Sequence, residues 1–369
     1  MVEREIALPE PAAWSDLDSA GAERWATERG QPRYRGRQLF EAIQRRGIAD
    51  VGEMHEFPAS LRRELAARAP TRTVRERVHL VSKRDGSEKV LLELADGAMV
   101  EAVSIPSGTA EGWRRSTICV SSQVGCPAAC TFCATGVQGF SRNLSGTEIV
   151  DQVMYFVPRL AARRRRVTNV VFMGMGEPLL NVPAVRDAVY RLTDPAGFNL
   201  GDRRITVSTV GIVPQMLKFS DWAGQVNLAV SLHAPNDELR SRLVPYNQHF
   251  PIRDILGAVH GYVEKTRRRV SFEYVLLHGV NDRPQLALEL ARLLRPLRGL
   301  AHVNVIPWNP FVGGRFVRSE GPDAETFVGV LREAGIKATI RYSKGLDISA
   351  ACGQLREREE PATRSLVPS

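Results

Sequence analysis

The sequence predicts an α/β fold in which a parallel sheet curls into a full or partial barrel. Three observations support this prediction. From about Ser116 onward, short apolar stretches alternate with segments of helical periodicity, as in sheets whose parallel strands are joined by helices. These stretches are apolar along most of their length, which is typical of strands buried on both faces. The chain has 369 residues, 43% of them hydrophobic, and is therefore long enough for one large domain and a smaller one.

Residues 1–75 are predicted to form a small helical domain. In RYRGRQLFEAIQRRG, Leu39, Phe40 and Ile43 recur at helical spacing, and Gly47 ends the helix. A second helix is expected in FPASLRRELAARAP. Arginines in this region, such as Arg62, suit contact with phosphate.

Residues 76–110 are predicted to be a β-rich linker. Hairpin turns are expected at Asp85-Gly86 and Asp96-Gly97. The strands that flank these turns are expected in RVHLVSK, EKVLLELAD and AMVEAVSIP.

The core domain is predicted over residues 111–355. Its strands are expected in STICVS, VTNVVFMG, RITVST, VNLAVSLH, VSFEYVLL, HVNVIPW and KATIRYS. Its helices are expected at 147–160, 182–193, 252–267, 284–295 and 323–334. Right-handed crossovers of this kind place the helices against the sheet. The polar residues 356–369 are predicted to be a flexible tail.

The composition favours a cytoplasmic protein with no membrane span. No run of eighteen apolar residues occurs, and MVEREIALPEPAAW lacks the basic and apolar regions of a secretory signal. Because cytosolic thiols stay reduced, clustered cysteines in such a protein are more often metal ligands or catalysts than disulfides.

The net charge of +9 arises largely from arginine, including the runs Arg163–Arg166 and Arg267–Arg269. Such a run is either a solvated helix face or the footprint of a polyanion such as a nucleic acid. Composition alone leaves both interpretations open.

Three of the five cysteines, Cys126, Cys130 and Cys133, lie within GCPAACTFCATG. Zinc usually takes four ligands, and His233 or His260 could supply the fourth. An iron–sulfur cluster held by three cysteines instead leaves one iron open to a small molecule. The trio follows a predicted strand, as sites in α/β folds commonly do.

A glycine-rich turn, GMGEP, follows the next predicted strand. Glycine allows the backbone to approach a ligand closely. The carboxylate of Glu177 can accept hydrogen bonds from an ammonium group.

The spacing C-x3-C-x2-C, with Phe132 beside the last cysteine and GMGEP after the next strand, resembles the radical S-adenosylmethionine (SAM) superfamily. Further motifs narrow the resemblance to the bacterial RNA methyltransferases that methylate adenine ring carbons. These motifs are CVSSQVGCPAACTFCATG, FMGMGEPLLN, STVGIVP, SLHAPND, VIPWNPF and DISAACGQL. The resemblance covers roughly residues 33–355 and implies a partial (β/α)6 barrel with an N-terminal accessory domain that helps to hold RNA.

The resemblance also implies the chemistry. One [4Fe-4S] cluster on Cys126, Cys130 and Cys133 cleaves SAM to a 5′-deoxyadenosyl radical, and two SAM molecules are used per turnover. Cys352 carries a methyl group from the first SAM, and its methylene radical adds to the adenine. Glu101 removes the ring proton, and Cys119 releases the product by forming a transient disulfide with Cys352.

The family's SAM site and partners carry over in the same way. Its SAM-binding residues match Gly176, Glu177, Ser208, Ser231, Leu232, His233 and Asn309. The implied partners are 23S rRNA and tRNA, together with an electron donor such as flavodoxin, and the implied state is a monomer.

Two alternatives remain at this point. One branch of the family methylates adenine carbon 8 instead of carbon 2, and Pro178 favours carbon 2. The other alternative belongs to a different class, a non-catalytic RNA-binding protein stabilised by zinc.

Overall fold

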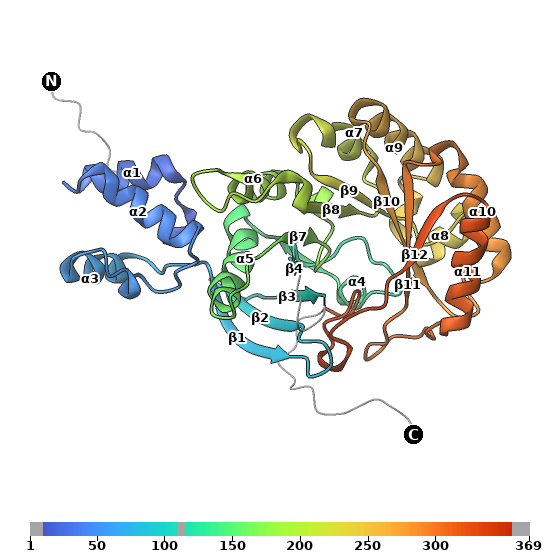
Figure 1. The fold of residues 1–369 in the computed structure, drawn as a ribbon, viewed down its shortest axis with the longest axis horizontal. Coiled ribbons are helices and arrows are strands. Elements are labelled where there is room, and N and C mark those ends of the chain that lie inside the picture. Colours follow the sequence, from blue (N-terminus) through green and yellow to red (C-terminus); the bar gives the residue numbers. More distant parts are fainter. Residues whose placement is uncertain (1–9, 109–114, 356–369) are drawn as a thin grey trace.

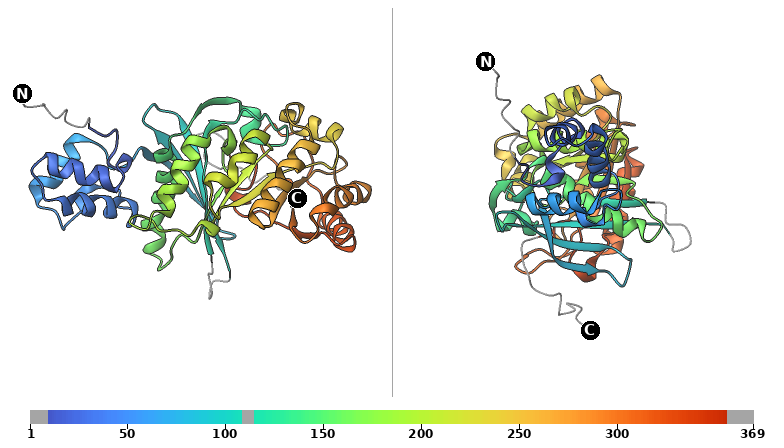
Figure 2. Two further views of the ribbon diagram at one scale, coloured as in Figure 1. Left: turned by 90° about the horizontal axis from the view of Figure 1, so that it is seen from above. Right: turned by 90° about the vertical axis from the view of Figure 1, so that its left-hand side faces the viewer.

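The computed structural model describes residues 10–108 and 115–355. Figures 1 and 2 show a helical lobe at the N-terminus, a twisted sheet beside it, and a ring of helices around the far part of that sheet. The predicted tail, residues 356–369, lies outside the described residues, as does the predicted boundary between residues 110 and 111.

The helices and strands follow the periodicity of the sequence closely in the core. The helices are α1 (Ser19–Glu28), α2 (Arg33–Gln44), α3 (Ala59–Arg68), α4 (Ala134–Gln138), α5 (Gly146–Ala161), α6 (Val182–Thr193), α7 (Val213–Trp222), α8 (Asp237–Leu243), α9 (Ile252–Thr266), α10 (Pro284–Leu294) and α11 (Gly321–Glu333). The strands are β1 (Val74–Val81), β2 (Glu88–Leu94), β3 (Met99–Ser107), β4 (Arg115–Cys119), β5 (Gln123–Gly125), β6 (Phe140–Asn143), β7 (Asn169–Phe172), β8 (Ile205–Thr209), β9 (Asn227–Ser231), β10 (Val270–Leu276), β11 (Ala301–Pro307) and β12 (Lys337–Ile340).

The main sheet has the order β1-β2-β3-β4-β7-β8-β9-β10-β11-β12. From β4 to β12 each neighbouring pair is parallel. Within the described residues, helices cross over between all successive parallel strands, and β12 does not close onto β4. The predicted partial (β/α)6 barrel is thus confirmed, with β12 as a further parallel strand.

The strands β1, β2 and β3, predicted as a linker, continue the same sheet in antiparallel order. Val103 on β3 pairs with Cys119 on β4, which starts the parallel part. Hydrogen bonding between these strands therefore joins residues 76–107 to the barrel instead of leaving them as a separate connector.

The N-terminal helices have their own core, in which Trp14 and Trp25 pack edge to face with ring centroids 4.7 Å apart. This lobe is joined to the barrel through Asp151 on α5, which is fully buried. Its carboxylate accepts hydrogen bonds from Ser15 Oγ (2.8 Å) and from the backbone N–H of Thr73 (2.7 Å). Arg191 on α6 adds a second link, since its guanidinium donates to Ser15 O (3.2 Å) and Asp16 O (3.0 Å). Polar contacts from α5 and α6 together fix the orientation of the lobe against the barrel.

Across the described residues, every helix is too short or too polar to span a bilayer. The helices α1, α4, α7 and α8 were not predicted. The short α4 and α8 lack a full period of apolar residues, so periodicity gives little signal for them.

Candidate active site

A cavity of about 970 Å³, measured out to its open mouth, lies at the carboxyl ends of the barrel strands. Its lining brings together most of the residues predicted to form the site, namely Cys126, Cys130, Cys133, Gly176, Glu177, Ser208, Ser231, His233, Asn309 and Cys352. Leu232, Cys119 and Glu101 do not line it. The strands place these side chains together because the carboxyl ends of parallel strands meet at one edge of the sheet.

The cysteine loop is shaped by two glycines. Gly125 has φ +75°, and a Cβ there would lie 2.1 Å from the carbonyl oxygen of Gly139. A Cβ on Gly136 would lie 2.7 Å from the carbonyl oxygen of Cys130, so α4 can pass close to the cysteine loop only with glycine at this position. The backbone N–H of Cys126 donates to Gly139 O at 2.7 Å. The loop is therefore held in place by its own backbone.

The three thiols fit a cluster better than a single zinc ion. Thiolates around one tetrahedral zinc, each about 2.3 Å from the metal, lie about 3.8 Å apart. Among the described residues, these three sulfurs are not all within 4.8 Å of one another. Burial raises the pKa of the Cys126 thiol to about 12, and burial together with Cys133 and Cys126 raises the pKa of Cys130 well above its ordinary value. Such thiols need a bound cation in order to ionise.

Neither His233 nor His260 offers the cysteine trio a ring nitrogen that is available to bind zinc. The Nδ1 atom of His233 accepts the backbone N–H of Val275 at 3.0 Å. His260 lies on α9 beside a separate hollow, and its Nδ1 lies 2.7 Å from Leu256 O. The arrangement therefore gives no support to a four-ligand zinc site.

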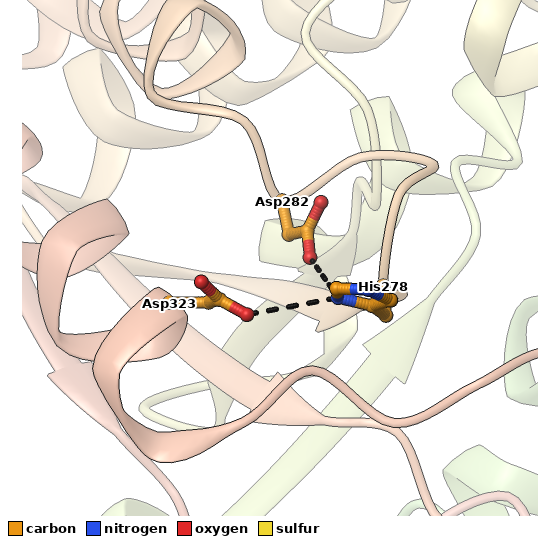
Figure 3. A group of neighbouring side chains, drawn as sticks. All are labelled: His278, Asp282 and Asp323. Carbon is orange, nitrogen blue, oxygen red and sulfur yellow. Dashed lines mark ion pairs between the residues drawn. The ribbon is translucent and has the colours of Figure 1, made fainter.

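Within the described residues, a group of side chains with the spacing of ligands to a single metal ion is His278, Asp282 and Asp323 (Figure 3). His278 Nδ1 lies 3.3 Å from Asp282 Oδ2 and 3.6 Å from Asp323 Oδ2. Asp282 also accepts hydrogen bonds from Gly279 N–H and from Ser319 Oγ, both at 3.0 Å. These contacts explain the group as a polar link between the loop after β10 and the start of α11.

The GMGEP turn lines the cavity on one side and packs against β5 on the other. A Cβ on Gly176, which has φ +104°, would lie 2.7 Å from Gln123 Cβ. Glu177 is buried and accepts backbone N–H groups of Leu179 (2.9 Å) and Val210 (2.7 Å), so its carboxylate joins the ends of β7 and β8. Burial raises the pKa of Glu177 to about 7, and the two N–H donors oppose that shift.

The ends of β8 and β9 present two hydroxyls and an imidazole. Ser208 Oγ and Ser231 Oγ lie 3.3 Å apart. His233 has φ +61° and packs edge to face on Phe132, with ring centroids 4.7 Å apart. Burial lowers the pKa of His233 to about 3, so the ring is neutral, and Nε2 carries the proton because Nδ1 is an acceptor. Leu232 faces the hydrophobic core, so only its backbone is near the cavity.

Asn309 holds the loop that carries Cys352. Its Nδ2 donates to Cys352 O at 3.0 Å and to Ser343 Oγ at 2.8 Å, while its Oδ1 accepts from Arg318 Nη1 at 2.8 Å. The Cys352 side chain lines the cavity and is accessible to solvent there. The surrounding cavity walls raise the pKa of its thiol to about 12, and the carboxylate of Glu273 adds to this shift.

Cys119 and Glu101 lie behind the cavity, on β4 and β3. All five cysteines are free thiols. Burial raises the pKa of Cys119 strongly, and the nearby Cys352 thiol adds to the shift, which puts the two sulfurs within electrostatic range. Glu101 is buried and pairs with Lys89, whose Nζ lies 2.7 Å from Glu101 Oε1 and 3.2 Å from Ser349 O. Lys89 therefore connects Glu101 to the loop that carries Cys352.

Two buried charged residues of the site were not predicted. Glu273 on β10 lines the cavity, is 7% exposed, and accepts Asn304 Nδ2 at 2.8 Å. Arg240 on α8 is 1% exposed and donates to the carbonyl oxygens of Ser231 and Leu232, both at 3.0 Å, and to that of Val210. A lone glutamate inside the apolar stretch VSFEYVLL is a signal that could have revealed Glu273. Arg240 in an ordinary helical stretch gives no such signal.

The arginine runs lie away from the cavity mouth. Arg163–Arg166 precede β7 and Arg267–Arg269 precede β10, so both runs are at the amino ends of the strands. Arg163 pairs with Glu88, and Arg268 donates to Asn227 Oδ1 at 2.6 Å. These arginines therefore do not surround the opening through which a substrate would enter the cavity.

Comparison with known proteins defines the class. Residues 120–291 match the radical SAM superfamily. The crystal structure of a radical SAM methyltransferase from Sphaerobacter thermophilus is similar, with a TM-score of 0.88 and 46% identity, and the match covers 94% of this chain and 99% of that chain. With three cysteines at the mouth of a partial barrel, the protein is a radical SAM enzyme. Enzymes of this class carry a [4Fe-4S] cluster and use SAM.

Relatives of similar length define the family. A probable dual-specificity RNA methyltransferase RlmN from Thermosynechococcus vestitus is 46% identical over 335 residues, covering 91% of this chain and 95% of that protein. The ribosomal RNA large subunit methyltransferase N of Nitrosopumilus maritimus is 44% identical over 337 residues, covering 90% and 95%. The chain belongs to the RlmN family of RNA methyltransferases. This membership excludes the alternative of a non-catalytic RNA-binding protein.

Proposed function

We propose that the enzyme methylates carbon 2 of an adenine in 23S rRNA and in tRNA. The observation that carries the proposal is that Cys352 lines the same cavity as the three clustered cysteines and the ends of β7, β8 and β9. Pro178, directly after Gly-Glu, favours carbon 2 over carbon 8. The names of the relatives support RNA as the substrate class.

Three cysteines and the residues around the strand ends have separate roles in the proposed reaction. Cys126, Cys130 and Cys133 would hold a [4Fe-4S] cluster, which would supply the electron that cleaves SAM to methionine and a 5′-deoxyadenosyl radical. SAM is bound by Gly176, Glu177, Ser208, Ser231, Leu232, His233 and Asn309, with Leu232 contributing its backbone. The electron comes from a donor such as flavodoxin, and the enzyme works as a monomer in the cytoplasm.

Cys352 is the methyl carrier in this proposal. Its thiol loses a proton, and the sulfur takes a methyl group from a first SAM, which leaves as S-adenosylhomocysteine. The 5′-deoxyadenosyl radical from a second SAM would take one hydrogen atom from that methyl group and leave as 5′-deoxyadenosine. The methylene radical that remains would bond to the electron-poor ring. Two SAM molecules are thus used per turnover.

Glu101 and Cys119 complete the reaction. Glu101, held by Lys89, accepts the ring proton. The unpaired electron left on the ring adduct would return to the oxidised cluster that supplied it. The Cys119 sulfur then attacks the Cys352 sulfur, the bond from that sulfur to the methylene carbon breaks, and this carbon takes a proton. External thiols reduce the resulting disulfide.

Isotope labelling tests this route. The holoenzyme is supplied with RNA and with SAM whose methyl group carries three deuterium atoms, and the RNA nucleosides are analysed by mass spectrometry. We expect 2-methyladenosine with two deuterium atoms, because one is removed on Cys352 and a solvent proton replaces it. A methyl group that keeps all three would contradict the carrier role, and 8-methyladenosine would contradict carbon 2.

A further inference from the structure

Exposed apolar side chains are concentrated in three segments near the cavity. Eleven large apolar residues are exposed among the described residues. Five of them are scattered over α2, β1, α6, α7 and α10. The other six are Val137, Phe140, Val312, Val317, Tyr342 and Leu346. We call these six residues the rim.

Hydrogen bonds show that the three segments meet around Cys352. The backbone N–H of Ala134 donates to Gly353 O at 2.8 Å, and Thr135 Oγ1 donates to Leu355 O at 2.6 Å. Gln354 Nε2 donates to Pro310 O at 2.5 Å. The segment with Val137 and Phe140, the loop after β11 and the loop after β12 therefore lie together next to Cys352, which lines the cavity, at the end of the barrel that carries α4 (Figure 1).

Arginines are interleaved with the rim. Arg315 and Arg341 are exposed, and the guanidinium carbon of Arg315 lies 5.8 Å from the centre of the Phe316 ring. Lys83 and Arg84 are exposed on the turn between β1 and β2, which contacts the same loop through Ser82 Oγ and Asp347 Oδ1 at 2.7 Å. Two exposed carboxylates, Asp347 and Glu320, lie in these segments as well. Basic groups outnumber acidic ones around the opening.

We propose that the rim is the docking surface for a single-stranded segment of the RNA substrate. Bases next to the target adenine stack on Phe140 and Tyr342, and their phosphates contact Arg315 and Arg341. This inference rests on the proposed function, because an adenine can reach Cys352 only after it has left its stack.

Physical chemistry favours RNA over a protein partner at this surface. Exposed aromatic rings interleaved with arginine are typical of single-stranded nucleic acid binding, in which each stacked base contributes substantially and the sequence matters little. The conspicuous arginine runs of the chain lie at the opposite ends of the strands. The rim arginines are therefore the ones placed to contact phosphates beside the cavity.

The test compares rim variants of the cluster-loaded enzyme. Binding of a short fluorescent single-stranded RNA is measured by anisotropy at several salt concentrations. Phe140→Ala and Tyr342→Ala should each weaken binding about 5- to 100-fold. Tyr342→Phe should restore it, whereas Tyr342→Leu should not. Arg315→Gln should lower the salt slope by about 0.7. The matched control is Tyr190→Ala, since Tyr190 on α6 is 52% exposed, similar to Tyr342 at 59%.

Each outcome decides the proposal. RNA affinity at the wild-type level in both alanine variants would overturn it. Unchanged RNA binding with slower reduction by flavodoxin would assign the rim to a protein partner and also overturn it. Failure of the proposed function looks different, because the wild-type enzyme would then form no 2-methyladenosine, whatever the rim variants bind.

Discussion

The cavity has one wall made of strand ends and another made of the loop that follows β12. On the strand wall, Glu177, Ser208, His233 and Glu273 are each more than nine-tenths buried. The first three lie at or just beyond strand ends, and Glu273 lies in the middle of β10. On the loop wall, Cys352 is exposed. The loop turns through left-handed backbone at Gly345, Ser349 and Gly353.

The two walls are also held in different ways. Strand ends are fixed by continuous backbone ladders, whereas the loop is fixed by separate hydrogen bonds, many of them from side chains such as Asn309, Gln354 and Lys89. Each such hydrogen bond contributes about 0.5–1.5 kcal/mol, so the loop can shift without disturbing the barrel. We infer that the strand wall holds SAM in one geometry, while the loop wall brings Cys352 first to SAM and then to Cys119.

The largest effect is expected at the fixed cysteine loop. Cys126→Ala, Cys130→Ala or Cys133→Ala should abolish the cluster and all SAM cleavage, because no other thiol can replace a ligand held by a rigid loop. Iron and sulfide content and the yield of 5′-deoxyadenosine measure this. Cys119→Ala serves as the control and should keep its iron. Normal iron and sulfide content in the three variants would show that the trio is not the ligand set.

Substitutions on the loop wall and at Cys119 should block the reaction at a different step. Cys352→Ala should keep the cluster but form no S-methyl group and no methylated RNA. Cys119→Ala should stop after the bond to the ring has formed, leaving protein and RNA joined through Cys352. A denaturing gel before and after ribonuclease treatment detects this species. Repeated turnover by folded Cys119→Ala without any crosslink would rule out its resolving role.

Substitution of Arg240 should destabilise the strand wall without changing the loop wall. Arg240→Met leaves the carbonyl oxygens of Val210, Ser231 and Leu232 without their donor, at a cost of about 4 kcal/mol in the free energy of unfolding. SAM affinity should fall as well. Arg242→Met on the same helix is the control, because Arg242 is exposed. Denaturant unfolding and SAM titration measure the two effects, and equal behaviour of both variants would remove Arg240 from this role.

Glu177 makes the strand wall sensitive to pH. Its folded pKa of about 7 lies above the ordinary value of 4.5, so the protonated form favours folding. In the cluster-free protein this contribution is complete below pH 4.5 and is lost as the pH rises to about 7, amounting to about 3 kcal/mol. Glu177→Gln should lack this dependence. Unfolding free energies between pH 4.5 and 8 test the difference, and parallel curves for both proteins would contradict it.

The smallest effect is expected where the loop wall is tied down. Asn309→Ala removes the hydrogen bonds to Cys352 O and Ser343 Oγ. Because these bonds contribute about 1–2 kcal/mol together, methylation of Cys352 should slow about 5- to 30-fold, as followed by intact-protein mass spectrometry. Ser343→Ala removes only one of the two bonds and should slow the reaction less. Equal rates in both variants would show that the bond to Cys352 O has no positioning role.

The sequence by itself determined what depends on neighbours along the chain. The cysteine trio lies within eight residues, so spacing alone put its thiols in one loop. The core strands and the helices α5, α6, α9, α10 and α11 followed from apolar periodicity, and their alternation predicted the barrel. The residues that the family resemblance predicts to bind SAM could be placed at strand ends, because parallel strands share one carboxyl edge.

Only the tertiary structure decided what depends on register and on long connections. Cys119 ends the first parallel strand and Cys352 follows the last one, and the fold brings their sulfurs close enough to interact electrostatically. Lys89 joins Glu101 to the loop of Cys352. The inward position of Glu273 follows from its pairing with Ser231 and Asn304, since a shift by one residue would turn its side chain to the other face. The antiparallel strands β1–β3 were predicted to form a linker, because local sequence does not show which sheet edge a strand will join. The physical reason is the same in each case: these contacts arise from chain segments far apart in sequence, and only the folded sheet brings them together.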